Sequence, residues 1–309
     1  MNGIIIINKP KDITSNNVVN KVKHILNTKV GHTGTLDPNA TGVLPLLLGD
    51  GTKFSKYLIN HDKKYRATLK LGTKTSTADV EGKIVEEKDV NEEIFSNEYI
   101  EKVLASFIGK QVQTPPVYSA IKVNGKKLYD YARKGIDVEV PSREIEIYGM
   151  ELIGFNRDER TIVFDVECSK GTYIRSLCED IAKKLYTVGY MLDLDRLRVG
   201  DFEISQSVTI EDLEKHSEDN EWISNHIITL EDVMKDYPRI DIPVNKLNLF
   251  LNGVKLDVNE AKQDAVDGVY KVYCNNIFLG SGTCFDGKIK RDIILNNGWK
   301  HAIISVEFT

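Results

Sequence analysis

The sequence lacks any apolar run that approaches the ~20 residues a membrane-spanning helix requires. Its most hydrophobic early stretch, residues 3–7, holds four isoleucines and is followed by the polar break Asn8-Lys9-Pro10. That stretch is shorter than the apolar core of a secretory signal peptide, and no basic leader precedes it. We therefore expect a protein that has no membrane span and works in the cytoplasm.

Cysteine is scarce, with four residues in 309, and none of them shows the Cys-x-x-Cys or Cys/His spacing of a metal site. We expect the thiols to pack as small apolar side chains in a reducing compartment. They are Cys168, Cys178, Cys274 and Cys284.

The net charge of −5 argues at first against a nucleic-acid ligand, but the charge is unevenly distributed. Residues 1–75 hold 12 Lys+Arg against 4 Asp+Glu, whereas residues 76–104 hold 3 against 9 and residues 201–240 hold 3 against 11. A basic region in an otherwise acidic chain fits a polyanionic ligand bound at one face. A lysine-rich surface that only contacts solvent explains the same counts.

Residue periodicity predicts strands and helices in turn, followed by a small β-rich module. We expect an α/β (α+β) fold with a mixed, mostly antiparallel central sheet flanked by helices. The length suits one large or two medium domains. Short β-like segments dominate after Pro238, so we divide the chain into 1–237 and 238–309. Strands are predicted at 3–7, 65–72, 119–123, 161–169 and 192–199. Helices are predicted after a cap at Thr14 or Ser15, at 52–59, 99–108 and 128–134, and from Ile174 to Leu185.

The segment Gly31–Gly42 is where we expect the chemistry. It contains one carboxylate, Asp37, among residues that shape the backbone, because glycine permits unusual φ angles and Pro38 biases Asp37 away from the helical region. No apolar period runs through it, which predicts a shaped loop. An ordinary turn has the same composition, since Asp, Gly and Pro are common in turns.

Three further polar residues lie at the ends of predicted elements. Arg175 begins a helix directly after a glycine turn, where its guanidinium could pair with a buried carboxylate and hold it ionised. Tyr65 and Tyr173 lie at strand ends, where an aromatic face could stack on a base. Tyrosines at such positions are also common core residues with a hydrated hydroxyl group, so a purely structural role stays open.

The segment Gly31–Gly42, GHTGTLDPNATG, resembles the catalytic motif of the bacterial tRNA pseudouridine-55 synthases, the TruB family. The similarity continues in order through residues 1–235, and FLGSG at Phe278–Gly282 resembles more weakly the small RNA-binding PUA domain of many members. The other matching segments are NKPKDITSNNVV at 8–19, DKKYRATLKLG at 62–72, YSAIKVNGKKLYDYARKG at 118–135, SKGTYIRSL at 169–177 and LDRLRVG at 194–200.

This resemblance implies an enzyme that isomerises a uridine in the T-loop of tRNA to pseudouridine, without cofactor or metal. Asp37 matches the family's catalytic aspartate, which acts on the ribose while the uracil is cleaved, turned and rejoined through C5. Whether the carboxylate adds covalently or abstracts a ribose proton to give a glycal is left open. The uridine would have to be flipped out of its stack, because C1′ and C5 are not reachable together within a stacked loop.

The resemblance also implies substrate-binding roles. Tyr65 matches the tyrosine that stacks on the base, Arg175 the arginine that pairs with the catalytic aspartate, and His32 the histidine that displaces the uridine. Tyr173 and Leu194 match residues that line the uracil pocket. The implied partner is the T-arm of tRNA, and we expect a monomer with no obligate protein partner.

Two other functions fit the residues. A non-catalytic RNA-binding or RNA-folding protein would use the same basic face with an inert Asp37. A glycosidase-type hydrolase would normally need a second carboxylate near the first, and no motif supplies one.

Overall fold

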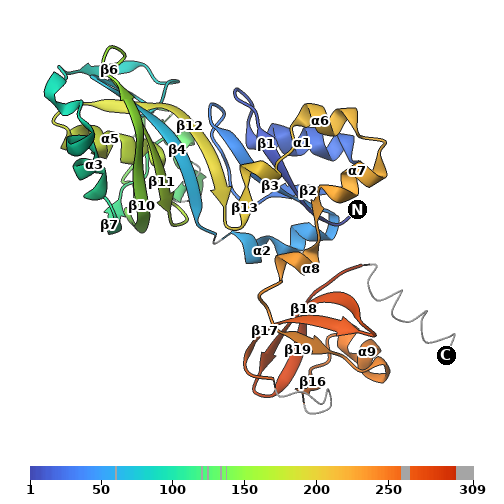
Figure 1. Ribbon diagram of the computed structural model, residues 1–309. Helices are drawn as coiled ribbons and strands as arrows, with labels where there is room; N and C mark the ends of the chain where they lie inside the picture. The colour runs from blue at the N-terminus through green and yellow to red at the C-terminus, as the bar shows by residue number, and fades with distance from the viewer. Residues whose placement is uncertain are drawn as a thin grey trace.

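A computed structural model describes residues 1–59, 61–119, 121–123, 125–132, 134–136, 138–258 and 265–296. The chain forms a large mixed sheet with helices packed on it, followed by a smaller β domain (Figure 1). No helix in these ranges is long and apolar enough to cross a membrane. The predicted fold class is confirmed: a mixed α/β body precedes a C-terminal β domain.

The large sheet has ten strands, and one parallel contact joins its two halves. At that contact β3 runs beside β12, with Thr41 opposite Asp195 and Gly42 opposite Arg196, whereas the other pairs in the sheet are antiparallel. In order the strands are β14 (Ile227–Ile228), β1 (Gly3–Lys9), β3 (Thr41–Leu48), β12 (Gly189–Val199), β4 (Lys63–Leu71), β11 (Thr161–Cys168), β10 (Arg143–Asn156) and β7 (Gly109–Gln113), with β2 (Val30–His32) on β3 and β13 (Phe202–Glu203) on β12.

Alternating side chains on β4 and β11 build the main core. Tyr65, Ala67 and Leu69 on β4 are buried on one face, as are Phe164 and Val166 on β11. Two helices cover this face, α3 (Asn97–Ala105) and α5 (Ile174–Lys184) (Figure 1). The period-2 and period-3.6 patterns in the sequence therefore predicted these elements correctly.

A second core forms where α1 (Ser15–Ile25) packs on β1 and β3. Thr14 caps α1 by accepting a hydrogen bond from the backbone N–H of Asn17, as predicted. The acidic segment 209–236 contains three short helices that pack on the body: α6 (Ile210–Lys215), α7 (Asn220–Asn225) and α8 (Leu230–Val233). The predicted helix at 52–59 is a 3-10 turn, η1 (Gly49–Phe54), that continues into α2 (Ser55–Leu58).

The longest strand, β10, was not predicted from the sequence. Two register shifts interrupt its pairing with β11, so no clean alternation runs through its 14 residues. The predicted strand at 119–123 is reduced to β8 (Lys122–Val123), which pairs with β9 (Lys126–Lys127). Ala120 of that prediction lies outside the described residues, and α4 (Leu128–Ala132) follows.

Two 3-10 turns and a two-stranded ribbon complete the body. A 3-10 turn, η2 (Glu92–Ile94), precedes α3, and another, η3 (Ile204–Gln206), follows β13. A separate two-stranded ribbon joins β5 (Thr73–Thr75) to β6 (Ile84–Glu87).

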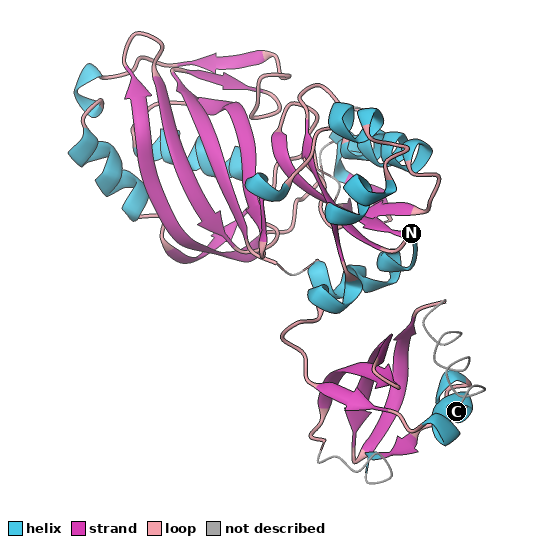
Figure 2. Cartoon of the chain, turned by 45° about the vertical axis from the view of Figure 1, so that its right-hand side comes forward, coloured by secondary structure: helices cyan, strands magenta, loops and turns pink. Residues whose placement is uncertain are grey.

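The C-terminal β domain has its own core and a five-stranded sheet (Figure 2). One helix, α9 (Val244–Leu251), was not predicted; it buries Leu247 and Phe250 against the sheet. The strand order is β15 (Arg239–Asp241), β17 (Gly268–Cys274), β18 (Ile277–Phe285), β19 (Lys288–Ile294) and β16 (Leu256–Asp257).

A tyrosine of α2 connects the two parts of the chain. The Tyr57 hydroxyl lies 2.9 Å from Ser281 Oγ and 2.8 Å from Asp292 Oδ2 of the C-terminal domain. Nearby, Phe54 and Met234 of the body share an apolar cluster with Ile293 of β19. The domain is therefore held against the body by both polar and apolar contacts.

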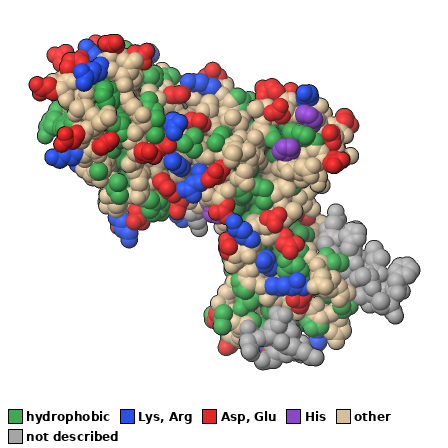
Figure 3. Space-filling view, in the orientation of Figure 1, with side chains coloured by type: hydrophobic (Ala, Val, Ile, Leu, Met, Phe, Trp, Pro, Cys, Tyr) green, Lys and Arg blue, Asp and Glu red, His purple; other side chains and the backbone are tan. Residues whose placement is uncertain are grey.

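The four cysteines are buried and free, as the sequence predicted. Acidic side chains gather at two ends of the face in Figure 3, over α3 and β6 and over α6 and α7. Lysine and arginine side chains lie between these ends, mixed with acidic ones, and over the C-terminal domain.

Candidate active site

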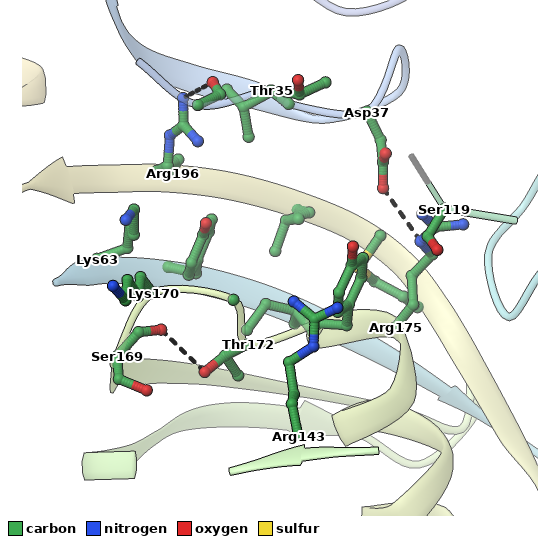
Figure 4. Close-up of a pocket in the computed structure, with 18 of the residues that line it drawn as sticks. Thr35, Asp37, Lys63, Ser119, Arg143, Ser169, Lys170, Thr172, Arg175 and Arg196 are labelled. Carbon is green, nitrogen blue, oxygen red and sulfur yellow. Dashed lines mark hydrogen bonds and ion pairs between the residues drawn. The ribbon is translucent and has the colours of Figure 1, made fainter. Parts of the chain in front are cut away.

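The predicted loop faces a pocket of about 700 Å³, between the loop on one side and β4, β12 and the start of α5 on the other (Figure 4). Asp37 of the loop lines this pocket together with four of the other predicted residues, Tyr65, Tyr173, Arg175 and Leu194. His32 is not among the residues that line it.

Buried side chains from other segments fasten the loop from behind. The ammonium group of Lys9, which has no exposed surface, donates to the carbonyls of Pro10, Ile13 and Pro38 at 2.8, 2.8 and 2.9 Å. Ser15 Oγ both accepts from the N–H and donates to the carbonyl of Leu36 at 2.9 Å. These contacts fix the backbone on both sides of Asp37, so the carboxylate is held on a braced loop.

Arg196 braces the loop from β12. Its fully buried guanidinium donates to the carbonyl of Val43 at 2.7 Å and to that of Gly34 at 3.2 Å. Gly42, at φ +102°, comes so close to the Arg196 backbone that a side chain there would collide with it. This glycine therefore serves the contact between β3 and β12, and Gly31 and Gly34 have no positive φ.

The central interaction is an ion pair between Arg175 Nε and Asp37 Oδ2 at 3.1 Å. The two side chains approach from opposite walls of the pocket in Figure 4. The Asp37 side chain is 37% exposed and lines the pocket, whereas the Arg175 side chain is 8% exposed. Enclosure by the protein raises the pKa of Asp37, and the charge of Arg175 opposes that rise.

One residue that contacts Arg175, Asp79, was not predicted from the sequence. Its Oδ2 lies 3.2 Å from Arg175 Nη1, and both side chains are 8% exposed. The Asp79 carboxylate also accepts hydrogen bonds from the Thr77 hydroxyl and from the N–H of Glu81. Asp79 stands in an acidic segment with no element periodicity, so no sequence signal distinguishes it from its exposed neighbours.

Arg175 is consequently held by the protein on every side. Besides the two carboxylates, Nη1 donates to the Thr77 carbonyl at 3.3 Å and Nη2 to the Tyr118 carbonyl at 3.0 Å. Two residues before Arg175, Tyr173 is fixed by Gln113, whose side chain donates to the Tyr173 carbonyl and accepts from its N–H at 3.0 and 2.8 Å. The start of α5 is therefore rigidly placed against the pocket.

Aromatic and apolar groups line the wall formed by β4 and β12. The Tyr65 ring lies there beside Leu194, with the charge of buried Arg196 close by. Burial raises the pKa of Tyr65, and the charge of Arg196 opposes that rise. Across the pocket, the Arg143 guanidinium lies 5.5 Å from the centre of the Tyr173 ring. Such a wall suits a flat ring.

His32 lies at the end of β2, opposite Leu46 of β3. Burial lowers its pKa, and the charge of Arg196 lowers it further, so the neutral imidazole is favoured. Its Nδ1 atom has no hydrogen-bond partner within the described ranges. His32 is therefore near the loop without forming part of the pocket wall.

The basic region 1–75 does not form one surface. Lys63 lines the pocket, but Lys64 and Arg66 lie on the opposite face of the sheet, where both pair with Asp165 at 3.4 and 2.7 Å. Other pocket cations come from elsewhere in the chain, among them Arg143 on β10 and Lys170 in the turn before α5. The fold thus collects positive charge around the pocket from distant segments.

This arrangement can bring a carboxylate, positioned by a guanidinium, to a ligand with a flat ring and a negatively charged backbone. The ring would lie against Tyr65 and Leu194, and phosphates would lie near the cations.

Comparison with known proteins identifies the family. Residues 22–174 match the model of the TruB family pseudouridylate synthase N-terminal domain, and residues 175–235 match that of the tRNA pseudouridylate synthase B C-terminal domain. A tRNA pseudouridine synthase B from Clostridium tetani is 44% identical over 91% of this chain and 95% of its own length. Another from Francisella tularensis subsp. tularensis is 43% identical over 94% of this chain and 93% of its own.

A solved structure is similar as well. One chain of a Cbf5–Nop10–Gar1 complex superposes with a TM-score of 0.68 at 25% identity, covering 95% of this chain and 84% of that one. With the sequence matches along nearly its whole length, the chain belongs to the TruB family of pseudouridine synthases, which are isomerases.

Proposed function

We propose that this protein isomerises uridine to pseudouridine in tRNA, at position 55 of the T-loop. The observation that supports this most directly is the ion pair of Asp37 and Arg175 in a pocket with an aromatic wall. The relatives from Clostridium tetani and Francisella tularensis are named as tRNA pseudouridine synthases B. We also propose that it acts as a monomer in the cytoplasm.

In the proposed reaction the Asp37 carboxylate acts on the ribose of the bound uridine. It either adds at C1′ or removes a ribose proton, and in both routes the N-glycosidic bond breaks while the uracil stays bound. The base turns, C5 bonds to C1′, and the C5 proton leaves. Arg175 keeps the carboxylate charged and aimed, Tyr65 stacks on the base, and Tyr173 and Leu194 enclose it.

The uridine would reach the pocket by flipping out of the T-loop, with His32 assisting from beside the loop. Lys63, Arg143 and Lys170 line the pocket, where they could neutralise the phosphates that flank the flipped nucleotide. We also propose that the C-terminal domain is PUA-like and binds RNA. Affinity for tRNA should then fall steeply as salt rises.

The test uses tRNA labelled with tritium at C5 of its uridines. We expect the wild-type protein to release tritium and form pseudouridine, and Asp37→Asn to do neither while still binding tRNA. Release that persists in Asp37→Asn would remove Asp37 from its role.

The same samples separate the alternative functions by their products. A non-catalytic RNA-binding protein would leave bound tRNA unmodified. A glycosidase-type hydrolase would produce free uracil in place of pseudouridine.

A further inference from the structure

One buried hydroxyl group in the pocket has no partner. Ser119 is 5% exposed, lines the pocket, and its Oγ atom makes no hydrogen bond with any described residue. Two other buried side-chain atoms share this condition, Nδ1 of His32 and Nδ1 of His61, but neither histidine lines the pocket. Because buried polar groups are nearly always hydrogen-bonded in folded proteins, such an atom in a binding pocket points to a ligand.

The backbone around Ser119 is firmly held. The carbonyl of the preceding residue, Tyr118, accepts a hydrogen bond from Arg175 Nη2 at 3.0 Å. The carbonyl of Ser119 itself accepts from the N–H of Tyr129 at 3.1 Å. The hydroxyl is therefore presented from a fixed position, and its lack of a partner follows from where the fold places it.

Neighbouring polar groups are already engaged by the protein. The donors of Arg175 face Asp37, Asp79 and two backbone carbonyls, and Thr172 donates to the carbonyl of Ser169 at 2.9 Å. The Ser119 hydroxyl can both donate and accept, so it differs from these groups in offering two unused interactions.

Ser119 lies on the side of the pocket where the sugar would bind. Ser119 directly follows Tyr118, whose carbonyl accepts from Arg175 Nη2, and the same guanidinium forms the ion pair with Asp37 (Figure 4). The wall suited to the base is formed by Tyr65 and Leu194 on β4 and β12. In the proposed reaction Asp37 acts on the ribose, so a group beside its ion pair meets the ribose as well.

On this basis, which rests on the proposed function, we infer that Ser119 binds the 2′-hydroxyl of the ribose of the target uridine. A 2′-hydroxyl is both donor and acceptor, so it can satisfy a serine hydroxyl in either direction. A uracil carbonyl could only accept. Ser119 would thus help the enzyme select a ribonucleotide over a deoxyribonucleotide, and it would position C1′ next to Asp37.

The test compares wild type with Ser119→Ala on two RNAs. The first is tRNA with the normal uridine; the second is a T-arm stem-loop with 2′-deoxyuridine at the target position, used as a competitive inhibitor. We expect Ser119→Ala to lower kcat/KM on the uridine tRNA roughly tenfold, the value of one hydrogen bond. The inhibition constant of the deoxyuridine RNA should stay within about twofold of wild type, because that RNA lacks the contact.

Two controls separate substrate binding from structure. Thr172→Val removes another pocket hydroxyl, one that is hydrogen-bonded to the protein. This variant should change kcat/KM on the uridine tRNA and the inhibition constant of the deoxyuridine RNA by the same factor. The thermal unfolding midpoint of Ser119→Ala should not fall, because the variant removes a buried hydroxyl without a protein partner. A lowered midpoint that accounts for the loss of activity would overturn the inference.

The remaining outcomes are also decisive. If Ser119→Ala leaves kcat/KM on the uridine tRNA unchanged, the contact is excluded. If the substitution lowers kcat/KM on that tRNA and weakens binding of the deoxyuridine RNA by the same factor, Ser119 contacts the base or a phosphate instead of the 2′-hydroxyl. A wild-type protein that forms no pseudouridine would refute the proposed function and this inference with it. Normal wild-type activity with an inert Asp37→Asn leaves the function standing whichever way Ser119 behaves.

Discussion

Asp79 and Arg175 form a buried ion pair of 3.2 Å immediately behind the pocket, although 96 residues separate them in the sequence. Asp79 does not line the pocket, but it contacts the same guanidinium that contacts Asp37. The guanidinium is therefore fixed between two carboxylates, one facing the pocket and the other held by Thr77 and Glu81. This relationship makes Asp79 a positioning residue.

Replacing Asp79 by Asn should reduce kcat by about 10- to 100-fold, because small displacements of a reacting group are costly. KM for tRNA should change little, since the side chain does not face the pocket. The free energy of unfolding should fall by about 1–3 kcal/mol, because a charged hydrogen bond to buried Arg175 is lost. Single-turnover kinetics and urea unfolding measure the two effects.

Asp193→Asn is the matched control. It removes a carboxylate from an ion pair with Lys11 whose side chains are 50% and 47% exposed. Such pairs contribute little, so stability should change by less than about 0.5 kcal/mol. Equal losses of kcat and of unfolding free energy in Asp79→Asn and Asp193→Asn would contradict the role given to Asp79.

The pH dependence of the reaction should reflect the environment of Asp37. Enclosure raises the pKa of this carboxyl from its ordinary 3.8, with Arg175 opposing the rise. The proposed reaction needs the ionised form, so activity is lost as pH falls through the raised pKa. In Arg175→Gln the opposing charge is gone, and the acidic limb of the single-turnover rate should move to higher pH.

Arg175→Lys keeps the charge and should move the acidic limb less than Arg175→Gln does. An acidic limb at the same pH in wild type and Arg175→Gln would show that it does not report on Asp37.

Lys9 should matter for activity although it does not line the pocket. Burial lowers its pKa to about 8, yet its charged form has three N–H groups and three carbonyls that accept them, including that of Pro38 beside Asp37. Lys9→Met keeps the length but leaves these carbonyls unpaired. We expect a loss of about 2–4 kcal/mol in unfolding free energy and a lower kcat.

Lys11→Met provides the comparison for Lys9. The Lys11 side chain is 47% exposed, and its ammonium group forms an ion pair with Asp193 at the surface. Its unfolding transition and kcat should stay close to wild type. Equal sensitivity at both lysines would remove the special role of the buried one.

Loss of the contact between the two parts of the chain should raise KM for full-length tRNA more than KM for a short RNA. In Tyr57→Phe the hydroxyl that meets Ser281 and Asp292 is lost. If the C-terminal domain binds tRNA, KM for full-length tRNA should rise about threefold to tenfold, as expected for one hydrogen bond that orients a domain. KM for an isolated T-arm stem-loop should not change.

Tyr186→Phe removes a tyrosine hydroxyl from a side chain that is 80% exposed and should leave both KM values unchanged. If Tyr57→Phe raises KM for both RNAs by the same factor, the defect lies in the body of the enzyme.

Several features of the protein were predictable from local patterns. The alternation on β4 and β11 and the apolar face of α5 follow from periodicities of 2 and 3.6, which are set by strand and helix geometry. The loop around Asp37 was predictable because glycine and proline constrain the backbone locally. β10 escaped prediction because its register shifts erase the period.

By itself, the sequence determined the family, through long motifs in a fixed order, and with it the expectation that Asp37 carries the chemistry. Only the tertiary structure decided which distant groups act on that residue. Asp79, Lys9 and Ser119 carry no local signal, because an ion pair, a buried ammonium group or an unpaired hydroxyl depends on partners brought together from distant segments. Periodicity records which face of an element is buried, but not what that face meets.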